Sequence, residues 1–171
     1  MKELILKTGK TSAPLFVRLF LSVVLFPHGA QKLLGWFGGY GFEGTMGYFT
    51  GTVGLPWIVG FFVILIEFMA PFALLIGLAT RIWSIAVFFL FLGIVYTSHA
   101  DYFFMNWFGN QKSEGAEYFL LILGMSLSLV ISGSGKYSVD RLLMAGKSSG
   151  ESKARFSMTG AEVVMAASDI L

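Results

Sequence analysis

The chain has 171 residues, of which 56% are hydrophobic and 13% charged, and its mean hydropathy is +0.75. Too few polar side chains remain to coat a soluble globule, so the composition indicates an integral membrane protein. The net charge of +2 is small and the basic residues are scattered between apolar runs, which argues against nucleic acid as a partner. Cysteine is absent, so any redox role depends on a bound cofactor or on another protein's thiols.

Four apolar stretches have about the length that a helix needs to cross a hydrocarbon core of about 30 Å. They cover approximately residues 13–34, 57–78, 82–100 and 116–132. The prediction is an all-α transmembrane four-helix bundle within a membrane domain, 13–140, that follows a short cytoplasmic segment, 1–12. A cleaved signal peptide is the alternative for the first stretch, but no A-x-A-like site follows it and three more spans do.

Two aromatic-rich connections and a polar tail complete the chain. Residues 35–54 hold eight glycines among six aromatic side chains, which is typical neither of a helix interior nor of a polar linker. We expect an interfacial or partly re-entrant outer loop there. A second aromatic loop follows the third span, at 102–114. Residues 141–171 are predicted to be a flexible cytoplasmic tail, in which capping-box spacing at 159–162 allows one short helix.

The basic residues give the expected orientation. Ten of the twelve lysines and arginines fall on one side of the predicted spans, and only Lys32 and Lys112 fall on the other. The positive-inside rule then places both termini of this multi-pass protein in the cytoplasm. Arg18 and Arg81 are interpreted as topology anchors or ion-pair partners at the inner side.

Ionisable residues from all four spans are predicted to meet in the outer half of the bundle. At about 1.5 Å per residue, His28 lies about 21 Å above the inner start of its span, and Glu67 about 16 Å above the inner end of its own. His99 comes out at about 26 Å, and Glu117 starts the fourth span at the outer boundary. Ionisable groups at such depth usually face a protein interior or a cavity.

His28 and Lys32 are four residues apart and share a helix face, with Gln31 on the adjoining face. Pro27 removes a backbone donor and loosens the span there, so a small polar chamber is expected. Two alternatives without a functional role remain open. Lys32 can snorkel to the outer headgroups, and His99 and Glu117 can be ordinary interfacial residues.

The chamber has two chemical interpretations. Two histidines at similar depth on different spans allow a bis-histidine haem, the less favoured reading. A histidine beside a carboxylate suits proton transfer or hydrogen bonding to a quinone-like ring better. No other metal site is expected, because the sequence has no zinc-ligand cluster, and it has no nucleotide-binding glycine motif either.

At these residues the chain resembles the DoxX family of small four-helix bacterial membrane proteins, over about residues 16–140. The matching pieces are Arg18 followed by His28-Gly29-Ala30-Gln31-Lys32, Glu67 leading through Gly77 to Arg81, and Gly133-Ser134-Gly135-Lys136-Tyr137-Ser138-Val139-Asp140. The resemblance implies a protein of the bacterial cytoplasmic (inner) membrane that is linked to redox functions, among them quinone-coupled sulfur oxidation and oxidative-stress complexes with soluble partners.

We therefore expect an accessory protein or subunit of a membrane oxidoreductase system that binds a quinone-like ligand among His28, Gln31, Lys32, Glu67, His99 and Glu117. Two alternatives are a non-enzymatic scaffold whose tail recruits a soluble enzyme at the cytoplasmic side, and a pathway for a small solute or protons. A bundle of four spans is narrow, so a transporter of this size is expected to form homo-oligomers.

Overall fold

The structure is a computed structural model that describes residues 6, 8–9, 11–98, 102–111 and 115–145. Its elements are α2 (Ala13–Leu34), the short 3-10 helix η1 (Trp36–Gly38), α3 (Gly41–Gly51), α4 (Trp57–Ile76), α5 (Thr80–Ser98) and α6 (Ala116–Ser132). Residues 139–145 are also helical, and no strand occurs in the described part of the chain. The all-α prediction is confirmed.

Within the described part of the chain, three helices, α2, α4 and α5, are long and apolar enough to cross a membrane. Their mean hydropathies over the best 18 residues are 1.5, 2.5 and 1.7. The fourth helix, α6, is apolar but has only 17 residues, at the lower limit for a spanning helix. The predicted count of four spans is therefore matched loosely, by three full-length helices and one shorter one.

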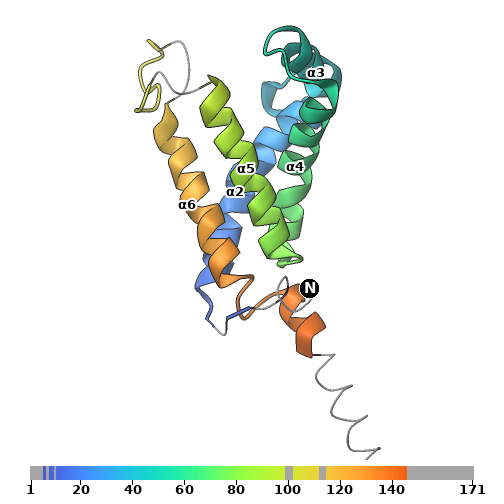
Figure 1. Cartoon of the computed structure of the whole chain (residues 1–171), viewed down its shortest axis with the longest axis vertical. Coiled ribbons are helices and arrows are strands. Elements are labelled where there is room, and N and C mark those ends of the chain that lie inside the picture. Colours follow the sequence, from blue (N-terminus) through green and yellow to red (C-terminus); the bar gives the residue numbers. More distant parts are fainter. Residues whose placement is uncertain (1–5, 7, 10, 99–101, 112–114, 146–171) are drawn as a thin grey trace, which may run out of the picture.

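The four long helices form two pairs that diverge toward one end of the molecule. α2 packs mainly on α4, and α5 packs mainly on α6. The pairs meet near the α4–α5 turn and separate toward the end that carries α3 (Figure 1). The buried core where they meet takes apolar side chains from each of the four helices: Leu21, Leu25, Ala70, Leu74, Val87, Phe91, Phe119, Ile122 and Leu129.

The α4–α5 turn is held by a residue from beyond α6. α4 ends at Gly77, whose φ of 72° is left-handed, a conformation that glycine adopts without steric cost. Asp140 accepts hydrogen bonds from the backbone N–H groups of Ala79 (2.6 Å) and Thr80 (3.1 Å). Its own N–H donates to the Gly77 carbonyl at 3.0 Å. Asp140 thus satisfies amides at the start of α5 that have no partner within the helix.

The outer connection was expected to be irregular loop, and this expectation was wrong for residues 41–51. They form the helix α3, which follows a tight turn in which Gly35, Gly38 and Gly41 all have positive φ. α3 exists despite its glycines because tertiary packing outweighs helix propensity. It buries Thr45 and Met46, and the Met46 sulfur lies 3.2 Å from where a Cβ on Gly60 would be.

The predicted tail, 141–171, lies largely outside the described residues. Only residues 141–145 are described, and they belong to the helical stretch 139–145, shown in orange in Figure 1. The predicted short helix near 159–162 lies outside the described residues altogether.

Candidate functional site

A cavity of about 870 Å³ lies between the two helix pairs, at the end of the bundle where they separate. Apolar and aromatic side chains from α3, α4, α5 and α6 make up most of its wall, and α2 contributes polar ones. Its polar lining is small and consists of His28, Lys32, Tyr48, Glu67, Thr97 and Tyr118. A large, mostly apolar cavity with a few convergent polar groups is the usual form of a small-molecule site.

The polar wall is built where α2 crosses α4 at Gly29. A Cβ on Gly29 would lie only 2.7 Å from the Phe68 Cα, so no other residue permits this approach. The same Cβ would overlap the carbonyl of Glu67. That carbonyl has no helical donor, because its partner in the i→i−4 pattern is Pro71, which lacks an N–H. The Gly29 crossing therefore places the neighbouring side chains of α2 directly beside Glu67.

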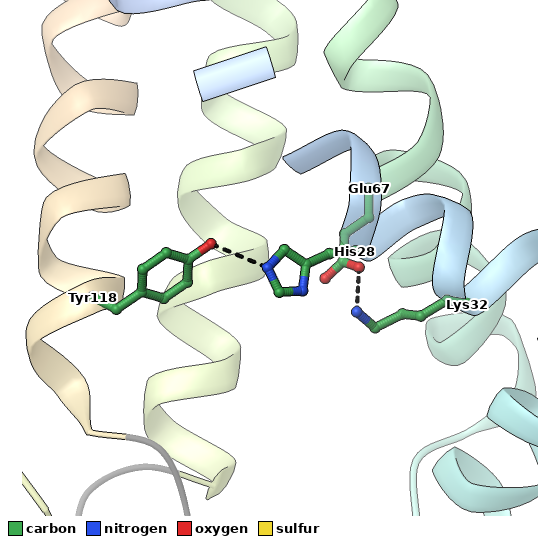
Figure 2. Close-up of polar contacts among 4 residues, drawn as sticks. All are labelled: His28, Lys32, Glu67 and Tyr118. Atoms are coloured by element: carbon green, nitrogen blue, oxygen red, sulfur yellow. Dashed lines mark hydrogen bonds and ion pairs between the residues drawn. The ribbon is translucent and has the colours of Figure 1, made fainter. Parts of the chain in front are cut away.

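Lys32 and Glu67 form an ion pair across this crossing, with 2.5 Å between Lys32 Nζ and Glu67 Oε2 (Figure 2). The Glu67 side chain is 2% exposed and that of Lys32 is 24% exposed. A buried carboxylate needs such a partner, because an unpaired charge is costly away from water. Of the two readings for Lys32, the structure has the inward one, with the ammonium turned to Glu67 and lining the cavity.

His28 lies between this ion pair and Tyr118 of α6. Its Nε2 is 3.4 Å from the Tyr118 hydroxyl, and the two ring centroids are 6.2 Å apart. Figure 2 shows the four side chains as a row that crosses from α6, through α2, to α4. A separation of 3.4 Å is long for a hydrogen bond, so either group can turn to a ligand at little cost.

This row presents donors and acceptors along one side of an apolar cavity. The Tyr118 hydroxyl and a neutral imidazole each offer one donor and one acceptor, and the Lys32 ammonium offers donors only. Such a set can hydrogen-bond a carbonyl or hydroxyl at the polar end of an otherwise apolar molecule. The Lys32–Glu67 pair is locally neutral, so the wall does not favour a charged ligand of either sign.

The other predicted site residues fall in different places. Gln31 does not line the cavity and donates from Nε2 to the Phe37 carbonyl at 3.2 Å, which fixes the turn after α2. Glu117 is half-buried and does not line the cavity either. Tyr118, the next residue, lines the cavity where Glu117 was expected to do so. His99 lies outside the described residues, and with it the proposed histidine pair for haem.

Arg18 and Arg81 lie at the opposite end of the bundle and do not contact the cavity. Arg18 is completely buried and donates to the carbonyls of Leu74 (3.3 Å) and Tyr137 (2.5 Å). Arg81 donates to the Ile131 carbonyl at 3.0 Å. Leu74 and Ile131 belong to the last turns of α4 and α6, where carbonyls lack helical partners and a cation is favourable. Both arginines therefore stabilise helix ends.

Tyr118 was not selected from the sequence, because a tyrosine at a helix start near the interface is ordinary in a membrane protein. The signal that could have found it is its position. It lies in the first turn of the fourth apolar stretch, 116–132, one residue after Glu117. Counted from the inner end of that stretch, it has about the depth of His28.

The comparisons with known proteins agree with this architecture. The DoxX family model matches residues 13–100, which contain α2 to α5 and both partners of the ion pair. The chain is also 30% identical over 136 residues to the protein named "Putative oxidoreductase CatD" of Bacillus subtilis (strain 168), covering 80% of this chain and 90% of that protein. No solved structure matches the chain significantly. The family match over half of the chain and the extended similarity to this relative show that the protein belongs to the DoxX family.

Proposed function

We propose that this protein is a redox-associated membrane protein whose cavity binds a quinone-like ligand. The ligand's ring lies in the apolar cavity and its carbonyl or hydroxyl groups bond to His28 and Tyr118. The Lys32–Glu67 pair closes the polar wall and polarises the same end of the ring. The Bacillus subtilis relative is named as an oxidoreductase, and this similarity supports a redox role.

One observation carries the proposal, namely the distribution of polarity in the cavity. Its volume of about 870 Å³ falls within the range of small-molecule sites, about 300–1,000 Å³. Four of its six polar residues lie in a single row, and most of the remaining wall is apolar. A flat apolar ring with polar atoms at its edge has this same distribution. A hydrated ion or a sugar would leave its polar groups unsatisfied against such a wall.

Binding of a short-chain benzoquinone to the purified protein in detergent tests the proposal, with tryptophan fluorescence as the readout. Tyr118→Phe removes one hydroxyl from the cavity and should weaken binding about 2- to 12-fold, as expected for a lost hydrogen bond of about 0.5–1.5 kcal/mol. Tyr96→Phe is the matched control, because Tyr96 is 87% exposed and does not line the cavity. If wild-type protein binds no quinone, and none is found in its lipid extract by mass spectrometry, the proposal is wrong.

We further propose that the protein lies in the cytoplasmic membrane with both termini in the cytoplasm. The α4–α5 turn and residues 133–145 lie at one end of the bundle, while α3 and residues 102–111 lie at the other (Figure 1). Among the described residues, this first end holds four basic side chains, namely Arg18, Arg81, Lys136 and Arg141. Labelling of single cysteines introduced at Thr52 and Tyr137 tests this topology, because only the first should react with an impermeant reagent added outside intact cells.

A further inference from the structure

A second, smaller hollow lies on the outside of the bundle between α4 and α5. This α4–α5 groove has a volume of about 350 Å³ and is lined by apolar side chains alone: Val59, Phe62, Val63, Ile66, Ala86, Phe89 and Leu90. Four of these seven residues, Val59, Val63, Phe89 and Leu90, also line the cavity. The groove and the cavity therefore share a border, to which these four side chains belong.

The groove lies where a lipid-soluble molecule would reach the cavity. Its α4 residues fall two to nine positions after the helix start at Trp57, which is about 3–14 Å of helical rise. That depth is in the half of the membrane that holds α3. α4 and α5 also separate toward this end (Figure 1), which is the end where the cavity lies.

The chemistry of the wall selects the kind of molecule that can pass. Along the groove no described side chain offers a hydrogen bond, so a polar group would lose its water there without compensation. A hydrocarbon chain loses nothing, because it exchanges lipid for valine, isoleucine and phenylalanine. The polar row of His28, Lys32, Glu67 and Tyr118 lines the cavity and not the groove.

We propose that the ligand is a lipid with a long apolar chain, which enters sideways from the membrane and leaves its chain in the α4–α5 groove while its polar ring occupies the cavity. This inference rests on the proposed function and adds the chain and its path. The side chains of Val63 and Phe89 act as the gate through which the chain passes, and Phe62, Ile66 and Ala86 contact the chain only outside the cavity.

Two quinones with the same ring test the path, one with no chain and one with a long isoprenoid chain. The measured quantity is the ratio of their affinities, because partition into the micelle affects each quinone equally in every variant. A chain held in the groove exchanges detergent for apolar side chains at little net cost, so the wild-type ratio is the reference. A chain excluded from the groove leaves methylenes facing water, and two such methylenes lower affinity roughly tenfold. Ala86→Trp fills the groove without touching the cavity, so it should lower the affinity of the long-chain quinone at least roughly tenfold relative to the chainless one while ring binding is unchanged.

Gly124→Trp is the matched control. Gly124 is exposed on α6, a Cβ there meets no atom within 4 Å, and it lines neither hollow. This variant should keep the wild-type affinity ratio. Ala86→Leu fills the groove less and should lower the relative affinity of the long-chain quinone partially. It replaces the tryptophan variant if that variant does not fold. A photoreactive side chain at Ile66 should crosslink to the long-chain quinone and leave the chainless one unlabelled.

The outcomes separate the two proposals. If neither quinone binds wild-type protein, both the proposed function and the lateral path are wrong. If both bind but Ala86→Trp leaves their affinity ratio at the wild-type value, the cavity binds quinones and the α4–α5 path is refuted. A loss of ring and chain binding to the same degree in Ala86→Trp also refutes the path, because the groove would then not be specific to the chain.

Discussion

Replacement of Gly29 by alanine should destabilise the protein through one close contact between two helix backbones. The added Cβ would lie 2.6 Å from the Glu67 carbonyl carbon, whereas ordinary contact begins at 3.4 Å. α2 and α4 would have to separate by at least about 0.8 Å, the difference between these two distances. The obstructing atoms belong to the α4 backbone, so no side-chain rotation can relieve the overlap. Overpacking of this kind costs about 1–3 kcal/mol.

Gly124→Ala should change the free energy of unfolding in the opposite direction. Both glycines are in helix interiors, where alanine is favoured by about 0.5–1 kcal/mol, but a Cβ at Gly124 meets no atom within 4 Å. Gly124→Ala should therefore raise the free energy of unfolding by about 0.5–1 kcal/mol. Both variants gain the same helix preference of alanine over glycine, so this contribution cancels in the difference between their free energies of unfolding. The difference reports the contact at the crossing and should be about 1–3 kcal/mol.

Unfolding by SDS titration in mixed micelles, followed by circular dichroism, measures both variants. Gly29→Ala should also lose quinone affinity, because separation of the helices pulls Lys32 away from Glu67. If Gly29→Ala is stabilised as much as Gly124→Ala, then α2 and α4 do not approach each other at Gly29. The polar wall of the cavity would then need a different explanation.

Three further predictions concern the charged and polar contacts. A double-mutant cycle with Lys32→Met and Glu67→Leu should give a coupling of about 0.5–3 kcal/mol in the free energy of unfolding. Each single variant should be less stable than the double variant, because it leaves one charge buried without its partner. Additive effects would contradict the ion pair. Asp140→Ala should lower the free energy of unfolding by about 0.5–2 kcal/mol, because α5 loses its cap. Asp140→Asn should lower it less, because one acceptor oxygen remains. Equal losses in the two variants would show that the hydrogen bonds from the α5 amides to Asp140 are unimportant. Tyr118→Phe should change unfolding free energy by less than about 1 kcal/mol, because its bond to His28 is long, and a larger loss would mark that bond as structural.

The sequence was sufficient for the parts that depend on hydropathy and helical rise. The apolar stretches locate the long helices to within a few residues, because a bilayer demands a continuous apolar run of fixed length. The same rise placed His28 and Glu67 about one turn apart, and the structure brings Lys32, four residues from His28, onto Glu67. A carboxylate in mid-span has few ways to be stable, so a partner at similar depth is expected from the sequence. The structure was needed to decide between pairing and snorkelling for Lys32.

The parts that failed depend on packing between elements. The helix α3 could not be predicted because glycine-rich sequence disfavours a helix locally, and only burial of Thr45 and Met46 against the bundle reverses that preference. The choice of Tyr118 over Glu117 depends on the rotation of α6 about its axis, which hydropathy leaves undetermined. The role of Asp140 requires contact across 60 residues, which no local pattern encodes.

The contact between Asp140 and the start of α5 also sets an order of assembly. Thr80 and Asp140 are separated by 60 residues, which a ribosome adds in roughly 3–12 s. During that interval α4 and α5 can enter the membrane, but the first amides of α5 have no carboxylate and Arg18 has no Tyr137 carbonyl. The bundle is therefore completed by a segment made after α6, and a chain cut before residue 137 would lack both contacts even though it contains α2, α4, α5 and α6.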